Sequence, residues 1–204
     1  MIEIFCYIAI AKRRMNMKKA AVIAAKGCEE GEVLTITDIL RRAEIECDLI
    51  GLCTKNIIGA HDIEIECDSV LTGDEDYDMI LLPGGYEGVD HMKESTVLND
   101  LLKKMNEEKK LIGALCAAPS VLGEAGILDG KKFACYPGVE VKAENAERSE
   151  DTIVLDGNIL TGKGPALAWA FAYAACDLLG ADSLTVKKRM VYYNAFDVKE
   201  EGNV

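Results

Sequence analysis

Histidine is scarce in this chain, as are tryptophan and proline. The 204 residues include 2 histidines, 1 tryptophan and 4 prolines. The two imidazoles, His61 and His91, lie far apart in the chain, and the 8 cysteines form no Cys-x-x-Cys pair. Zinc sites usually need several such ligands at close spacing. We therefore expect no metal and no cofactor.

Basic residues are also fewer than acidic residues. Lys and Arg total 23 against 35 Asp and Glu, which gives a formal net charge of −12 at pH 7. A surface this acidic repels phosphate backbones and anionic lipid surfaces. We therefore expect neither nucleic acid nor membrane as a partner.

No long hydrophobic run is present, although a membrane-spanning helix needs about 20 apolar residues. The apolar run Ile4–Ala11 is too short, and basic residues follow it, whereas a signal peptide places them first. We predict that residues 1–17 are an N-terminal extension, and we hypothesise that Met17 is the natural start. Several cysteines lie in apolar runs, where free cysteine behaves as a small hydrophobic residue. These features favour a reduced, cytoplasmic protein.

Strand-like and helix-like segments alternate along the chain, which predicts an α/β domain with a mostly parallel sheet and helices on both faces. We assign residues 18–190 to this domain and residues 191–204 to a polar C-terminal tail that is frayed from Tyr192 onward. The expected strands are Ala20–Ala25, Glu46–Leu52, Asp62–Cys67, Tyr77–Leu82, Leu111–Cys116, Lys132–Cys135, Thr152–Leu155 and Asn158–Thr161. The expected helices are Glu29–Ala43, Thr96–Lys109, Ala117–Ala125 and Pro165–Leu179.

Cys116 lies where a buried strand is expected to turn directly into a helix. Such a nucleophile elbow holds the side chain above the carboxyl end of the sheet. The N–H groups of the following helix would favour the thiolate and lower its pKa. The alternative is an inert cysteine in the core.

Glycine and backbone N–H groups supply a second part of the candidate site. Gly84 and Gly85 end the neighbouring strand, and glycine permits close approach of the backbone to a ligand. The N–H groups of Gly85 and Ala117 could form an oxyanion hole. The simpler interpretation is a plain turn after the strand.

Three carboxylates crowd the start of the first helix. We interpret Glu29 and Glu30 as solvated groups that interact with the helix dipole. Glu32 lies one turn further in, before apolar residues, and is expected to point into the crevice at the sheet end. Burial there would raise its pKa and suit it to general acid or base chemistry. His61 and His91 are interpreted as surface or loop residues.

Four motifs in order resemble the DJ-1 branch of the ThiJ/PfpI superfamily, from Lys18 to about Val186. They are Ala25-Lys26-Gly27-Cys28-Glu29-Glu30-Gly31-Glu32, Leu82-Pro83-Gly84-Gly85, Gly113-Ala114-Leu115-Cys116-Ala117-Ala118-Pro119 and Leu160-Thr161-Gly162-Lys163-Gly164-Pro165. This resemblance implies a flavodoxin-like three-layer α/β/α sandwich and a homodimer.

The resemblance also implies roles for individual residues. Cys116 corresponds to the reactive cysteine, Glu32 to the protonated carboxylic acid beside it, and Gly85 and Ala117 to the backbone donors. The family often has a histidine in a Thr-His-Pro segment near the cysteine, where this chain has Tyr136. Tyrosine donates a hydrogen bond but does not accept a proton near neutral pH.

The function implied is a cysteine-dependent, glutathione-independent glyoxalase, or the related deglycase, acting on small 2-oxoaldehydes such as methylglyoxal. The alternatives are a redox sensor in which Cys116 is oxidised to a sulfinate, and an interaction protein in which Cys116 is inert. Ala117 directly after the cysteine argues against a peptidase. The absence of histidine after His91 excludes an amidotransferase triad. Whether Cys28 or Cys135 acts as a resolving thiol is left open.

Overall fold

A computed structural model describes residues 18–195, and a seven-stranded sheet forms its centre. The strand order is β10-β11-β7-β6-β1-β2-β5. All neighbours pair in parallel except β10, which runs antiparallel to β11. The strands are β1 (Lys19–Ala24), β2 (Glu46–Gly51), β5 (Ser69–Val70), β6 (Met79–Leu82), β7 (Leu111–Leu115), β10 (Ile153–Asp156) and β11 (Ile159–Gly162).

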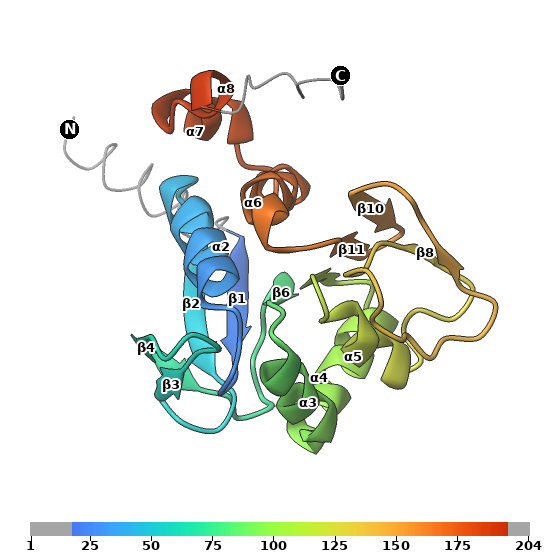
Figure 1. The fold of residues 1–204 in the computed structure, drawn as a ribbon. Coiled ribbons are helices and arrows are strands. Elements are labelled where there is room, and N and C mark those ends of the chain that lie inside the picture. The colour runs from blue at the N-terminus through green and yellow to red at the C-terminus, as the bar shows by residue number, and fades with distance from the viewer. Residues whose placement is uncertain (1–17, 196–204) are drawn as a thin grey trace, which may run out of the picture.

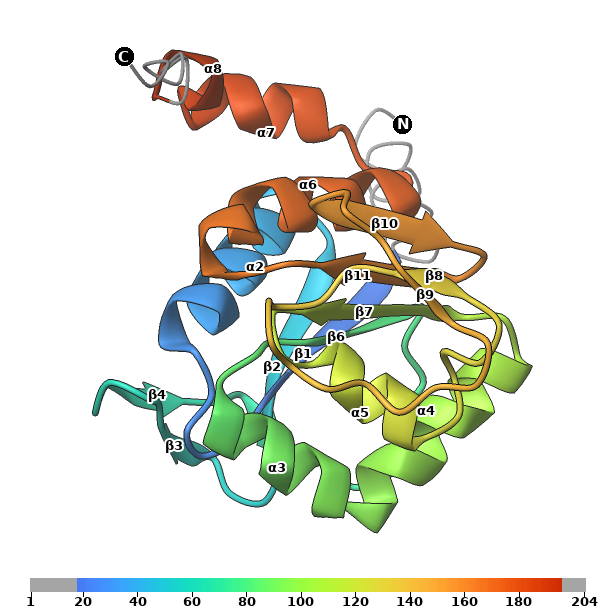
Figure 2. The ribbon, with the colours of Figure 1, turned by 45° about the vertical axis from the view of Figure 1, so that its right-hand side comes forward.

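Helices cover both faces of the sheet, as the sequence predicts (Figures 1 and 2). On one face α2 packs against α6, which follows a short 3₁₀ turn, η1, and α7 and α8 lie beyond α6. The helices α3, α4 and α5 cover the other face. The helical bounds are α2 (Glu30–Arg42), α3 (Tyr86–Glu94), α4 (Thr96–Glu107), α5 (Pro119–Glu124), η1 (Pro165–Leu167), α6 (Ala168–Leu178), α7 (Ser183–Arg189) and α8 (Tyr192–Ala195).

The central strands are buried on both sides, which explains their unbroken apolar sequences. Residues 20–24 of β1 and all four residues of β6 are buried. Parallel strands covered by helices on both faces have this composition, because neither side of the strand meets water. The three-layer sandwich is therefore confirmed. Between residues 18 and 195, no helix is long and apolar enough to cross a membrane.

Two small sheets lie outside the central one. β3 (Asn56–Ile58) pairs antiparallel with β4 (Glu64–Glu66), and β8 (Lys132–Phe133) pairs with β9 (Glu147–Arg148). The expected strand Asp62–Cys67 is thus too long. Ile63 is 51% exposed, because residues before β4 form a turn in which Gly59 N–H donates to Ile63 O at 3.0 Å. The N–H of Cys67 donates to Lys55 O at 2.7 Å, which continues the antiparallel pairing one residue beyond the bounds of β3 and β4.

The sequence pattern did not predict α3, which begins directly after Gly85. Only Gly88, Val89 and Met92 of this helix are buried, so its apolar periodicity is weak. The tail also differs from the expectation of fraying at its start, because Tyr192–Ala195 form α8. The predicted N-terminal extension, residues 1–17, and the remainder of the tail, residues 196–204, lie outside the described residues.

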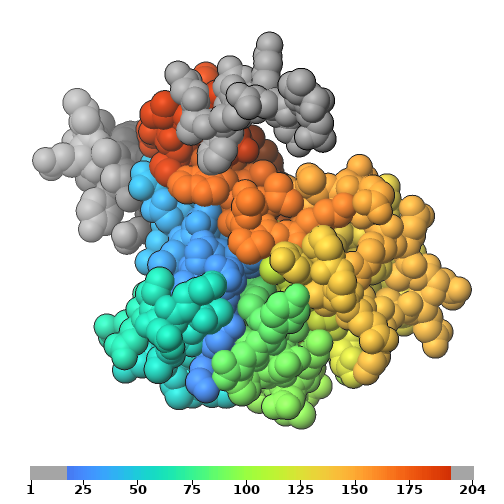
Figure 3. All heavy atoms as spheres, in the orientation of Figure 1, coloured from blue at the N-terminus to red at the C-terminus, as the bar shows by residue number. Residues whose placement is uncertain are grey.

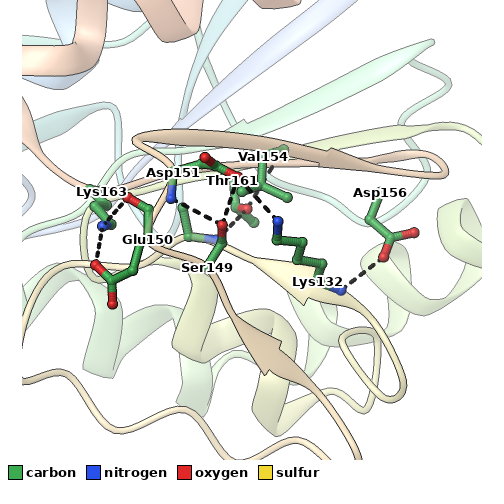
Figure 4. Close-up of polar contacts among 9 residues, drawn as sticks. Lys132, Ser149, Glu150, Asp151, Val154, Asp156, Thr161 and Lys163 are labelled. Carbon is green, nitrogen blue, oxygen red and sulfur yellow. Dashed lines mark hydrogen bonds and ion pairs between the residues drawn. The ribbon is translucent and has the colours of Figure 1, made fainter.

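Polar contacts tie the segment around β8 to the edge of the central sheet (Figure 4). Lys132 N–H donates to Asp156 at 2.8 Å, and its ammonium pairs with Asp151 at 3.1 Å. Thr161 Oγ1 accepts the N–H of Ala134 at 2.9 Å. Lys163 Nζ donates to the backbone oxygen of Glu150 at 2.6 Å. These contacts fix the course of the chain just before residues 135 and 136, which approach Cys116.

We predict that Phe171→Ala lowers the free energy of unfolding by about 3–5 kcal/mol. Phe171 is fully buried, and a Cβ placed on Gly113 or Gly162 would lie 3.0 or 3.2 Å from its ring. The ring thus fills the space that glycines in β7 and β11 leave open. Chemical denaturation measures the change. Leu184→Ala, at a side chain 48% exposed, is the control and should cost less than about 1 kcal/mol. Equal losses in the two variants would contradict this packing.

Candidate active site

Cys116 directly follows β7 and has a left-handed backbone, with φ of 59°. Its N–H donates to Gly162 O at 2.9 Å. Its carbonyl oxygen accepts the N–H of Tyr136 at 2.8 Å and the thiol of Cys135 at 3.3 Å. Non-glycine residues adopt this conformation at some energetic cost, so the surrounding bonds must hold it in place. The structure therefore places Cys116 at a nucleophile elbow, with 8% of the residue exposed.

The end of β6 lies against Cys116. A Cβ on Gly84 would lie 2.6 Å from Cys116 Cβ, and one on Gly85 would lie 2.4 Å from Gly27 O. Gly85 also has φ of 92°, which favours glycine. The backbone N–H groups of Gly85 and Ala117 face the Cys116 sulfur and favour its ionised form, which acts to lower the pKa of the thiol. Gly84, Gly85 and Ala117 are thus brought together around the thiol, more tightly than in a plain turn.

Glu32 projects from the first turn of α2 into the same place and is fully buried. Its Oε2 accepts the N–H of Gly84 at 2.6 Å. Its carboxyl group also interacts with the thiol of Cys116. The other oxygen, Oε1, is buried and has no partner of good hydrogen-bond geometry in residues 18–195. A buried carboxyl oxygen without a donor disfavours the ionised form.

Burial raises the pKa of Glu32 to about 7, even though the Gly84 N–H and the Cys116 thiol both favour its ionised form. For Cys116, burial and the adjacent Glu32 raise the pKa of the thiol, while the N–H groups of Ala117 and Gly85 act in the opposite direction. The prediction that the helix N-terminus lowers the pKa of the Cys116 thiol is therefore wrong, because the neighbouring Glu32 and burial raise it. Helix α5 begins only at Pro119 and has 6 residues, so the positive partial charge at its N-terminus stabilises the Cys116 thiolate only weakly.

Glu30 corrects a second expectation, because it is 2% exposed rather than solvated. Its carboxylate accepts the N–H of His61 at 2.6 Å and lies 2.9 Å from His61 Nδ1. The hydrogen bond to Glu30 raises the pKa of His61, whose side chain is 67% exposed. Glu29, Glu30 and His61 each place one metal-ligating atom within 4.8 Å of the others. The prediction that His61 is a surface residue is correct, but the sequence did not predict its contact with Glu30.

Tyr136 and Tyr86 stand at the same end of the sheet. Tyr136 is 37% exposed, and its ring centroid lies 6.4 Å from that of Tyr86 at an interplanar angle of 87°. Tyr86 is the first residue of α3 and was not predicted as a site residue. The sequence feature that could have identified Tyr86 as a site residue is its position directly after Pro83-Gly84-Gly85. Figure 3 shows the green surface of α3 meeting the yellow surface of the segment after β8, below the orange surface of α6.

Comparison with known proteins assigns the chain and its fold to one family. The DJ-1/PfpI family model matches residues 18–178. The chain belongs to the DJ-1/PfpI family. It is 36% identical to Protein dj-1beta of Drosophila melanogaster over 87% of this chain and 99% of that protein. The crystal structure of Drosophila DJ-1beta superposes with a TM-score of 0.81 and 34% identity, covering 86% of this chain and 98% of that one.

A relative with a named activity is also similar. The glutathione-independent glyoxalase DJR-1.2 of Caenorhabditis elegans is 30% identical over 81% of this chain and 91% of that protein. The match spans nearly the full length of that enzyme. This DJ-1/PfpI family member therefore has a DJ-1-type function.

We predict a pH-dependent stability that Glu32→Gln removes. Because burial raises the pKa of Glu32 from 4.5 to about 7, this group stabilises the fold below about pH 4.5 and loses that contribution as the pH rises through 7. The loss is up to about 3 kcal/mol. When both proteins are denatured at pH values from about 4.5 to about 8, the free energy of unfolding of Glu32→Gln should rise by that amount relative to the wild type.

Glu150→Gln is the matched control, because its side chain is fully exposed. The free energy of unfolding of Glu150→Gln should change with pH in the same way as that of the wild type. A constant gap between Glu32→Gln and the wild type would show that Glu32 has an ordinary pKa.

Proposed function

We propose that this chain is a glutathione-independent glyoxalase that converts 2-oxoaldehydes such as methylglyoxal to 2-hydroxy acids. The observation that supports this most is the contact between the Cys116 thiol and the buried Glu32 carboxyl, between the N–H groups of Gly85 and Ala117. A nucleophile, a proton carrier and two oxyanion donors are what an aldehyde rearrangement needs.

The first step forms a carbon–sulfur bond. Cys116 and Glu32 hold at least one proton between them near neutral pH, because burial raises the pKa of both groups and Glu32 raises that of the thiol further. The thiolate attacks the aldehyde carbon, C1, and the proton passes from Glu32 to the aldehyde oxygen. The N–H groups of Gly85 and Ala117 stabilise the developing negative charge on that oxygen. A hemithioacetal results, and Glu32 is left as a carboxylate.

The second step moves a hydrogen between carbons. The Glu32 carboxylate removes the C1 proton to give an enediol, and the proton is returned to C2. C1 is thereby oxidised to a thioester and C2 is reduced to an alcohol, so no external oxidant is needed. Water then hydrolyses the thioester, releases the 2-hydroxy acid and restores the thiol. Glu32 serves as the base throughout.

The same geometry supports a second function, redox sensing. Peroxide would convert the Cys116 thiolate to a sulfenic acid with loss of hydroxide or water, and a second peroxide would give the sulfinate. The N–H groups of Gly85 and Ala117 and a protonated Glu32 would donate to the sulfinate oxygens. The observation that favours it is the same set of donors around one sulfur.

We also propose a homodimer located in the cytoplasm, acting on a small aldehyde. Light scattering on the purified protein at several concentrations tests the dimer, and a constant monomer mass would reject it.

We predict that wild-type protein forms lactate from methylglyoxal without glutathione, and that Cys116→Ala abolishes turnover. Glu32→Gln should lower kcat by at least about 100-fold, because its amide keeps the hydrogen bonds but cannot move a proton. Cys53→Ala is the matched control: Cys53 is an exposed free thiol and its loss should leave the rate unchanged. Persistent turnover in Cys116→Ala would reject the mechanism, and no turnover in the wild type would reject the activity.

We predict a different pattern for oxidation. Mild peroxide should add about 32 Da to Cys116 in the wild type and in Glu32→Gln, because the amide still donates to the sulfinate. Peptide mass spectrometry locates the added mass, with Cys53 as the internal reference for an exposed thiol. A Cys116 that stays unmodified in excess peroxide would eliminate the sensor function.

A further inference from the structure

Two large aromatic side chains stand partly in solvent beside Cys116. Tyr86 is 67% exposed and Tyr136 is 37% exposed, and their rings meet edge to face. Neither hydroxyl group hydrogen-bonds to any residue in the described part of the chain. The two rings therefore leave apolar surface in water without a compensating polar contact. Exposed aromatic pairs of this kind commonly mark a binding surface.

The backbone attaches both rings directly to the groups that surround the thiol. Tyr86 follows Gly85, whose N–H contacts the Cys116 sulfur. The N–H of Tyr136 donates to the carbonyl oxygen of Cys116 at 2.8 Å. The two segments that carry these rings therefore both contact Cys116 through their backbones.

Arg148 fixes the backbone of the segment that carries Tyr136. Arg148 Nη1 donates to the Tyr136 carbonyl oxygen at 3.2 Å, and its Nη2 donates to Val139 O. Gly164 lies next to the Tyr136 ring, since a Cβ placed there would be in van der Waals contact with it at 3.4 Å. Arg148 and the hydrogen bond to Cys116 fix the backbone from which the Tyr136 ring projects, which lowers the cost of ordering this segment when a ligand binds.

We propose that Tyr86 and Tyr136 flank the entrance to Cys116 and bind the side group of the substrate, so that 2-oxoaldehydes with an aryl group are preferred. The proposal rests on the proposed function and adds its substrate class. The face of one tyrosine and the edge of the other offer offset and edge-to-face contacts to an aryl ring. The single methyl group of methylglyoxal covers far less of this surface.

The test compares kcat/KM for phenylglyoxal with kcat/KM for methylglyoxal in each protein. Taking this ratio cancels effects of a variant on Cys116 and Glu32 themselves. We expect the ratio to fall by about tenfold in Tyr86→Ala and in Tyr136→Ala, because each removes one aromatic contact. Tyr86→Phe and Tyr136→Phe should keep the wild-type ratio, since the ring and not the hydroxyl makes the contact. Tyr193→Ala, at a tyrosine 52% exposed in α8, is the control and should also keep it.

A ratio unchanged within about twofold in both alanine variants would overturn the proposal. A loss in the phenylalanine variants equal to that in the alanine variants would also overturn it, because a hydroxyl would then be responsible. If the wild type turns over neither aldehyde, the proposed function fails separately. The same ratio is then taken from alkylation of Cys116 by phenyl and methyl vinyl sulfone, followed by mass spectrometry. A loss of phenyl preference in the alanine variants supports the aryl surface there, and an equal ratio in all variants rejects it.

Discussion

The contact between the Glu32 carboxyl and the Cys116 thiol is the interaction on which the site depends. Glu32 is fully buried, its Oε2 accepts the N–H of Gly84, and its carboxyl group contacts the Cys116 thiol. Burial raises the pKa of both acidic groups, so the pair keeps at least one proton near neutral pH. A buried acid that keeps a proton at that pH can donate it and then act as a base. The proposed aldehyde chemistry uses both properties in turn.

The parallel sheet creates this contact by ending three neighbouring strands at one edge. β1 leads into the turn before α2, β6 leads into Pro83-Gly84-Gly85, and β7 is followed directly by Cys116. The order β7-β6-β1 brings these ends side by side, although they are distant in the sequence. Glycine at 84 and 85 then permits an approach that a Cβ would block. The edge segment after β8 supplies the remaining side, through Tyr136 on the Cys116 carbonyl.

Sequence patterns predicted the part of this arrangement that depends on burial and on strand ends. Alternating apolar segments were enough to predict the sandwich, and residues at strand ends were enough to select Cys116, Glu32, Gly85 and Ala117 as candidates. The exposed helix α3 was missed because only one side of a short helix packs, and with it Tyr86 was missed. The burial of Glu30 was missed because its partner, His61, comes from a distant turn. The pKa of Cys116 was misjudged because the effect of Glu32 depends on three-dimensional proximity that the helix-dipole argument ignores.

The most direct test of the shared proton is the titration of Glu32 itself. NMR of protein labelled with ¹³C at the glutamate carboxyl carbon follows each carboxyl group with pH, and the resonance missing in Glu32→Gln identifies Glu32. We predict a midpoint near 7, well above the ordinary 4.5. In Cys116→Ala we predict a still higher midpoint, since the thiol contact favours the ionised acid. A midpoint near 4.5 in the wild type would contradict a protonated Glu32 beside the thiol, and with it the proposed chemistry.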